Sequence, residues 1–291
     1  CAASDGVDAF CIGSEMRALL QIRGDGDSFP AVAQMVDLLH EVRAILGAGV
    51  KLTYAADWSE YWGHNDGAGN RYFHLDPLWS DDDLDVIGID NYMPVADWRD
   101  GEAHRDHADG WRDIYDRRYL AANIAGGEGF DWYYADTPDR EAQYRRPITD
   151  DQGEPWFWRF KDLRGWWENF HTERLNGVQA DEPTDWAPRS KPVWFTEYGC
   201  AAIDKGANQP NVFLDPKSSE SHVPHFSTGA RDDLMQMQYL LAMHDFWTDP
   251  ANNPASDVYA GPMVDWSRCH AWAWDARPWP WFPANTGVWS D

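Results

Sequence analysis

The amino-acid sequence predicts an α/β protein with a (β/α)8 TIM barrel, seen as strands four to eight with long loop insertions. Three observations support this prediction. A length of 291 residues fits one such barrel. Strand-like and helical segments alternate along the first third of the chain, which is typical of parallel strand pairing. Several strand-like runs end in polar residues, and the active sites of such barrels lie at the C-terminal ends of the strands.

Five segments read as strands because each is a short apolar run bounded by turn-forming or polar residues. They are residues 8–15, 50–56, 85–92, 191–198 and 268–274. A closed barrel has eight strands. We therefore expect the three missing strands to precede residue 1, so that the chain is a fragment of a longer protein.

Two long helices are expected between these strands. The first has Ser28 as its cap and Pro30 in its first turn, and its apolar residues follow helical spacing up to Gly47. The second covers residues 231–247. We expect five apolar residues to form its buried side: Leu234, Met237, Leu240, Leu241 and Met243.

Residues 97–190 break the alternation of strands and helices. They are rich in Trp, Tyr, Asp, Arg and Gly. We interpret them as an insertion after the third visible strand that covers the barrel mouth, within a single domain that spans residues 1–291. A separate small domain is the alternative.

Composition excludes several classes of function. A net charge of −25 argues against binding to nucleic acids or to anionic membranes. No apolar stretch reaches the roughly 18–20 residues of a membrane span, so we expect no membrane insertion. The four cysteines form no C-x-x-C pair. We expect Cys11 and Cys269 to be buried thiols, while a bridge between Cys11 and Cys200 stays open.

Two glutamates end strand-like runs and indicate hydrolysis of glycosidic bonds. Glu15 closes the first strand and Glu197 the fourth visible one. A barrel brings such residues together, and glycoside hydrolysis needs two carboxylates, one as acid/base and one as nucleophile or second base. The alternative for Glu15 is a helix N-terminal glutamate. The alternative for Glu197 is a structural carboxylate paired with an arginine.

Other polar and aromatic residues near the strand ends are candidate sugar-binding groups. Aromatic rings stack on sugars, and short polar side chains hold hydroxyl groups. The alternatives are loop capping for the aspartate and core packing for the nineteen tryptophans. The candidates are Asp57, Trp58, Asn91, Tyr92, Tyr198 and Trp274. His64, His222 and His225 lack metal-ligand spacing, so we assign no metal, and no organic cofactor is implied.

Several of these motifs resemble known families. The run from Phe10 to Arg17 resembles the fourth-strand motif of the glycoside hydrolase superfamily of (β/α)8 barrels, and residues 194–200 resemble its seventh-strand nucleophile motif. Residues 204–221, together with Arg231-Asp-Asp, resemble the TIM-barrel-like domain of gene transfer agent tail proteins. These are large hub or baseplate proteins of phage-like particles, and the resemblance covers nearly the whole chain.

The resemblance implies a place at the tail tip of a particle that is assembled in the cytoplasm and is extracellular once released. It implies two kinds of partner: other tail or baseplate proteins, and a polysaccharide or peptidoglycan glycan of the host envelope. Most hydrolases of the superfamily carry Asn before the acid/base glutamate, where it binds the sugar 2-hydroxyl. Ser14 stands there in this chain, which leaves room for an N-acetyl substituent.

These features together predict a retaining β-glycoside hydrolase module, with Glu15 as acid/base and Glu197 as nucleophile. Retention requires the two carboxyl groups to lie about 5–5.5 Å apart, against roughly 6.5–9.5 Å for inversion. The alternative is an inactive module of the tail hub that binds carbohydrate or has a structural role only.

Overall fold

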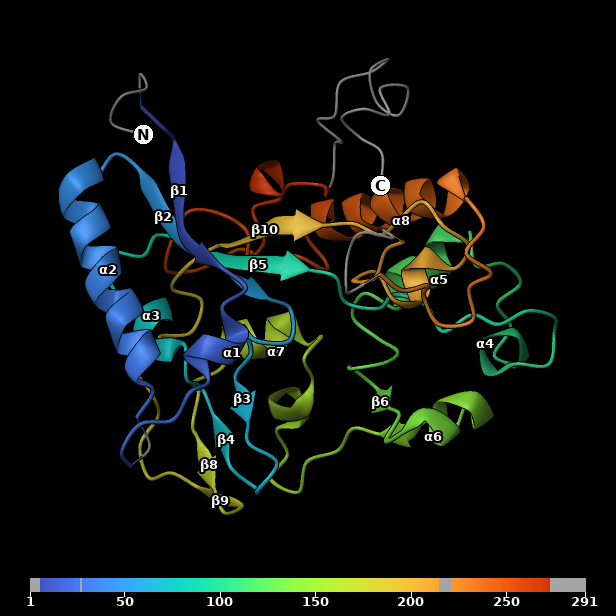
Figure 1. Ribbon diagram of the computed structural model, residues 1–291, viewed down its shortest axis with the longest axis horizontal. Coiled ribbons are helices and arrows are strands. Elements are labelled where there is room, and N and C mark those ends of the chain that lie inside the picture. Colours follow the sequence, from blue (N-terminus) through green and yellow to red (C-terminus); the bar gives the residue numbers. More distant parts are fainter. Residues whose placement is uncertain (1–5, 27, 215–220, 273–291) are drawn as a thin grey trace.

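A parallel four-stranded sheet forms the centre of the computed structural model, which describes residues 6–26, 28–214 and 221–272 (Figure 1). Its strands run in the order β1, β2, β5, β10. Their bounds are Ala9–Ser14, Lys51–Asp57, Ile87–Asn91 and Val193–Tyr198. Each pairs with its neighbour in parallel. Four of the five expected strands are thus confirmed.

The fifth expected strand, at 268–274, is only partly seen. A short 3-10 helix, η3 (Trp266–Arg268), occupies its start. The chain then pairs with β10 through a parallel bridge between Tyr198 and Ala271. Residues beyond 272 lie outside the described part of the chain.

The parallel sheet is open in the part of the chain that the structure describes. No described strand pairs with the free edge of β1, and the sheet does not close into a barrel within residues 6–26, 28–214 and 221–272. The fold seen is therefore the four-stranded parallel α/β part expected of a TIM-barrel-like domain.

Helix α2 (Pro30–Leu46) covers one end of the sheet, beside β1 and β2 (Figure 1). It confirms the first predicted helix, and Val32, Met35 and Leu39 are its buried residues. The expected cap is wrong. Phe29 occupies the cap position, and the Ser28 hydroxyl instead donates to the carbonyl of Asp25. The short helices α1 (Arg17–Leu20) and α3 (Asp76–Trp79) flank it in sequence.

Helix α8 (Asp233–Thr248) confirms the second predicted helix, but most of the expected buried side is wrong. Leu234, Met237 and Leu241 are more than a third exposed. Apolar residues lie all around this helix, so their spacing does not mark one face. Its buried residues are Met235, Tyr239, Ala242, Met243 and Trp247. The ring of Trp247 lies 5.4 Å from that of Phe195, which fixes α8 against β10.

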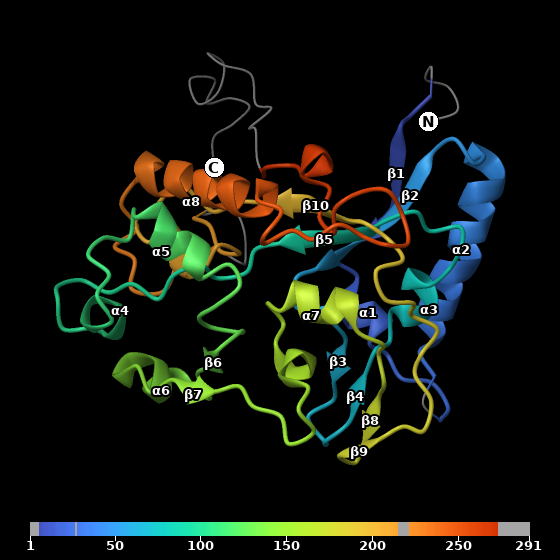
Figure 2. The ribbon, with the colours of Figure 1, turned by 180° about the vertical axis from the view of Figure 1, so that it is seen from behind.

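Residues 97–190 contribute to the same hydrophobic core as the sheet. Trp166, Trp167 and Trp186 are fully buried there, together with Trp79 from α3. Helix α5 packs against α8, as Figure 2 shows from behind. The elements of this segment are α4 (Arg105–Ala108), α5 (Arg117–Ala122), β6 (Trp132–Tyr133), α6 (Thr137–Ala142), β7 (Arg146–Pro147), η1 (Pro155–Trp158), α7 (Leu163–Glu168), β8 (Arg174–Leu175) and β9 (Val178–Gln179).

A small antiparallel sheet joins this segment to the first half of the chain. Its strand order is β3, β4, β8, β9, in which β3 (His64–Asn65) and β4 (Arg71–Tyr72) follow the loop after β2. The guanidinium of Arg174 in β8 binds Glu154 at 2.9 Å and also contacts Asp150. No helix among the described residues is long and apolar enough to cross a membrane.

Candidate functional site

A cavity of about 840 Å³ lies at the carboxyl ends of the parallel strands. It is lined by residues at the carboxyl ends of β1, β2, β5 and β10, by α1, by the loop after β10 and by one side chain of α8. The described lining consists of Glu15, Arg17, Ala18, Gln21, Asp57, Tyr92, Glu197, Cys200, Ala201, Pro210, Asn211, Val212, Phe213, Gln236 and Trp272. Residues 97–190, expected to cover the barrel mouth, contribute none of these.

The two glutamates predicted to act together line this one cavity. Each follows an irregularity in its strand. The register between β1 and β2 shifts between Cys11 and Ser14, and that between β10 and β5 shifts between Phe195 and Glu197. Such bulges redirect a side chain at a barrel rim. Glu15 also has a left-handed backbone, with φ of 50°, and its N–H donates to the carbonyl of Ala55 at 2.8 Å.

Tyr92 contacts the candidate nucleophile directly. Its hydroxyl donates a hydrogen bond of 2.6 Å to Oε2 of Glu197. Burial raises the pKa of Tyr92 well above its ordinary value, and the bond and charge of Glu197 raise it further, followed by Asp90 and Glu15. The charges of both glutamates therefore act on one hydroxyl. Among the described residues no arginine forms an ion pair with Glu197, contrary to the structural alternative.

Some of the other predicted residues lie at the cavity and some do not. Asp57 lines it, and Oδ1 of Asp57 also accepts the N–H of Ser59 at 2.8 Å, a capping role. Trp58, Asn91 and Tyr198 lie elsewhere among the described residues. Trp58 packs on Phe160 with ring centroids 5.1 Å apart. Trp274 lies outside the described residues.

Asn91 and Tyr198 face away from the cavity. They are register partners in β5 and β10. Asn91 lines a small gap beside Met243, on the side of the sheet that α8 covers. The ring of Tyr198 packs against that of Trp266, with centroids 4.9 Å apart. Alternation along each strand explains the outcome, because the neighbouring residues point to opposite faces.

Asp90 is a residue of the site that sequence reasoning did not select. It is buried, and its carboxylate accepts hydrogen bonds from the hydroxyls of Ser14 at 3.2 Å and Thr196 at 2.6 Å. Burial raises the pKa of Asp90 to about 6, with Glu197 and Asp57 adding to the rise and the two hydroxyls opposing it. Ser14 thus contacts Asp90 and does not line the described cavity. The alternation that places Asn91 outward was the signal for Asp90.

Two exposed aromatic side chains line the cavity. Trp272 is 59% exposed and Phe213 is 45% exposed. Trp272 is held beside β10 because its N–H donates to the carbonyl of Tyr198 at 2.8 Å. Phe213 comes from the loop after β10, for which the sequence offered no strand or helix pattern. Rings with one free face are suited to stacking on sugars.

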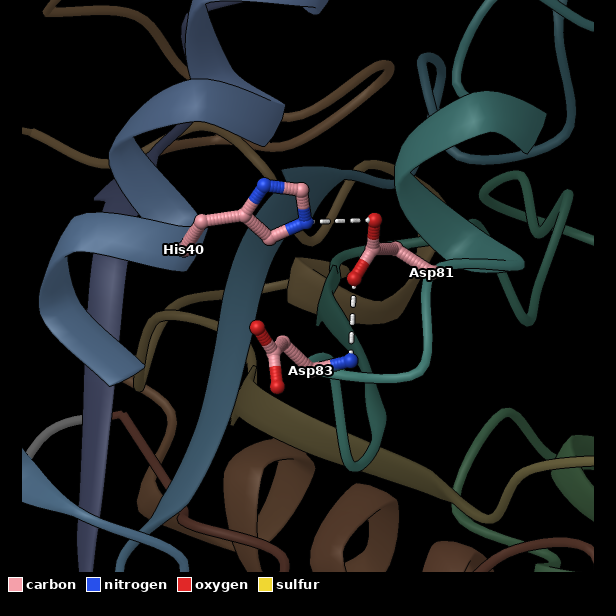
Figure 3. Close-up of side chains that lie close together, drawn as sticks. All are labelled: His40, Asp81 and Asp83. Atoms are coloured by element: carbon pink, nitrogen blue, oxygen red, sulfur yellow. Dashed lines mark hydrogen bonds and ion pairs between the residues drawn. The ribbon is translucent and has the colours of Figure 1, made fainter. Parts of the chain in front are cut away.

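One cluster away from the cavity has the composition of a metal site. His40 on α2 lies 2.9 Å from Asp81, and Asp83 is close by (Figure 3). The carboxylate of Asp83 already lies 3.6 Å from Nε of Arg43, and the hydrogen bond that His40 donates to Asp81 raises the pKa of His40. Because His40 and Arg43 already bind these carboxylates, we describe the cluster as a polar network that fixes α2 to the loop before β5.

The open parallel sheet, the flanking helices and the cavity at the strand ends together define a TIM-barrel-like α/β domain. The chain belongs to the GTA TIM-barrel-like domain family, whose model matches residues 1–283. This confirms the resemblance to gene transfer agents and marks the chain as a component of a phage-like particle. A search of curated proteins found no match.

Proposed function

We propose that this domain is a retaining β-glycoside hydrolase that acts on a polysaccharide of the host envelope. One observation carries the proposal: Glu15 and Glu197, separated by most of the chain, line a single cavity. Its volume falls within the range of about 300–1,000 Å³ typical of ligand sites. Peptidoglycan glycan and capsular polysaccharide are the two substrates that fit an envelope target.

In the proposed reaction Glu197 is the nucleophile. The hydrogen bond from Tyr92 holds Oε2 of this carboxylate and so orients the group. An oxygen of Glu197 attacks the anomeric carbon while Glu15 gives its proton to the departing glycosidic oxygen. Glu15 then takes a proton from water, which attacks the same carbon, breaks the bond to Glu197 and releases the sugar with its original configuration.

The lining aromatic residues supply the binding surface in this proposal. Trp272 and Phe213 offer ring faces for sugars, while Asp57 and Gln236 supply polar groups beside them. A carbohydrate chain needs both kinds of contact, because its rings have apolar faces and polar edges.

Family membership supports a place at the tail tip, where the domain would meet the envelope and contact other tail or baseplate proteins. The particle would be assembled in the cytoplasm and act outside the cell after release. An inactive carbohydrate-binding or structural module of the tail hub is the alternative that the following experiment separates.

The test measures release of reducing ends from purified sacculi and from capsular polysaccharide. Wild type should release sugar with retained anomeric configuration by NMR, and Glu15→Gln and Glu197→Gln should each lose at least a hundredfold in rate. With an aryl glycoside whose leaving group needs no protonation, azide should restore turnover in a Glu15→Ala variant, because azide attacks the glycosyl-enzyme without a base, breaks the bond to Glu197 and gives a glycosyl azide of retained configuration. Glu102→Gln is the matched control, since Glu102 is exposed and does not line the cavity.

Binding of glycan by wild type with no release of reducing ends would establish the binding-module alternative. Release with inverted configuration would assign Glu197 the role of base and would overturn the proposed covalent step.

A further inference from the structure

The carboxylate of Asp90 joins the two residues that directly precede the two glutamates. Its Oδ2 accepts the hydroxyl of Ser14, which precedes Glu15, and its Oδ1 accepts the hydroxyl of Thr196, which precedes Glu197. We propose that Asp90 is a positioning residue that fixes the placement of Glu15 relative to Glu197. This inference rests on the proposed function for its catalytic meaning.

The contact with Ser14 reaches across an intervening strand. In the sheet, β2 lies between β1 and β5. Ser14 pairs with Ala55, and Ala55 pairs with Gly88 two residues before Asp90. Ala55 carries only a methyl group, and the backbones of β2 and β5 approach each other closely at Gly88. A Cβ at Gly88 would lie only 2.5 Å from the carbonyl oxygen of Tyr54.

The side-chain clamp acts where the backbone of both glutamates is irregular. Each follows a shift of register, where regular strand pairing is interrupted. Glu15 also has a left-handed backbone that non-glycine residues adopt only when their surroundings hold them. The two hydrogen bonds that Asp90 accepts hold the residues directly before the glutamates, and so restrict where each glutamate side chain begins.

The ionised form of Asp90 suits this role, because both of its oxygens accept a hydrogen bond. Protonation would turn one oxygen into a donor and weaken one side of the clamp. The pKa of Asp90, at about 6, puts this change below neutral pH. The titratable groups that face Asp90 are Glu197 on β10, Asp57 and Tyr54 on β2, Cys11 on β1 and Tyr92 after β5.

The test combines kinetics with crystal structures of wild type and Asp90→Asn. The amide keeps the volume of the carboxylate but replaces one acceptor by a donor. We expect kcat to fall about tenfold to a hundredfold with KM changed less than threefold, because a displacement near 1 Å has an effect of that size. We also expect the separation of the two glutamate carboxyls to change by about 1 Å, and the titration near pH 6 to disappear from the pH–rate profile.

Single removal of each donor provides an independent check. Ser14→Ala and Thr196→Val should each reproduce part of the fall in kcat. When either is combined with Asp90→Asn, the fall in kcat should be smaller than the product of the two single falls. Thr53→Val is the matched control, because Thr53 is a buried hydroxyl on β2 that bonds to backbone carbonyls and not to Asp90.

The structural readout separates this inference from the proposed function. An unchanged carboxyl separation in Asp90→Asn, with kcat within twofold of wild type, overturns the positioning role and leaves the hydrolase proposal intact. A wild type without hydrolytic activity overturns the proposed function, and the carboxyl separation in the two crystal structures then still decides what Asp90 does.

Discussion

Glu60 offers the clearest test of the electrostatics around the cavity. Its carboxyl group is fully buried and accepts a hydrogen bond from the hydroxyl of Tyr54, which lies 3.0 and 3.2 Å from its two oxygens. The same hydroxyl accepts the N–H of Met16 at 2.7 Å, directly after Glu15. Burial raises the pKa of Glu60 from 4.5 to about 7, although the bonds to Tyr54 and the backbone of Asp57 oppose the rise.

This shift predicts how stability changes with pH. Between pH 4.5 and 7 the folded protein holds a proton on Glu60 more tightly than the unfolded chain does. The contribution of Glu60 to the free energy of unfolding is therefore full below pH 4.5 and is lost as the pH rises through 7. One pKa unit corresponds to about 1.4 kcal/mol, so the full change is about 3 kcal/mol.

The experiment compares wild type with Glu60→Gln by urea unfolding, followed by tryptophan fluorescence, at about pH 5 and about pH 8. The lower limit avoids the isoelectric point near 4.5. Relative to the variant, the free energy of unfolding of wild type should fall by about 2–3 kcal/mol from about pH 5 to about pH 8, since glutamine does not titrate. Glu41→Gln, at an exposed position of α2, should show no such change. A difference between wild type and Glu60→Gln that is the same at both pH values would refute the reasoning.

Three further predictions concern the core and the cavity. Leu39→Ala should lower the free energy of unfolding by about 2–5 kcal/mol, whereas Leu38→Ala, at a 38% exposed neighbour, should change it by less than about 1 kcal/mol in the same urea titration. Gly88→Ala should be poorly tolerated, because its Cβ would meet backbone between β2 and β5, and its thermal midpoint should drop while that of Gly49→Ala stays near wild type. Trp272→Ala should weaken glycan binding at least fivefold by calorimetry. An unchanged affinity would show that this ring is not part of the binding surface.

Most of the parallel sheet was predictable from the sequence because buried parallel strands are continuous apolar runs. Residues 85–92 are an example, and β5 is buried throughout. Helix α2 was predictable for a similar reason, since its apolar residues keep one face. The same reasoning failed for the buried side of α8, where apolar residues surround the whole helix and tertiary packing decides which of them are covered.

The candidate site was predictable only in part. Glu15 and Glu197 stand out because each ends an apolar run, and the barrel rule places such ends together. The strand register decides which residue near a strand end faces the cavity. Bulges that precede both glutamates change this register. For that reason Asp90 was missed while Asn91 was selected. Phe213 depends on the path of an irregular loop, for which short-range patterns carry no information.

The free edge of β1 has a practical consequence for studying the chain. Cys11 lies on this strand and is exposed. Partial desolvation nevertheless raises the pKa of its thiol, and the charges of Asp90 and Glu197 raise it further. The sulfur is therefore protonated at neutral pH and reacts slowly with alkylating agents until the pH is raised. A spectroscopic label attached to Cys11 would report whether another polypeptide segment binds along the free edge of β1.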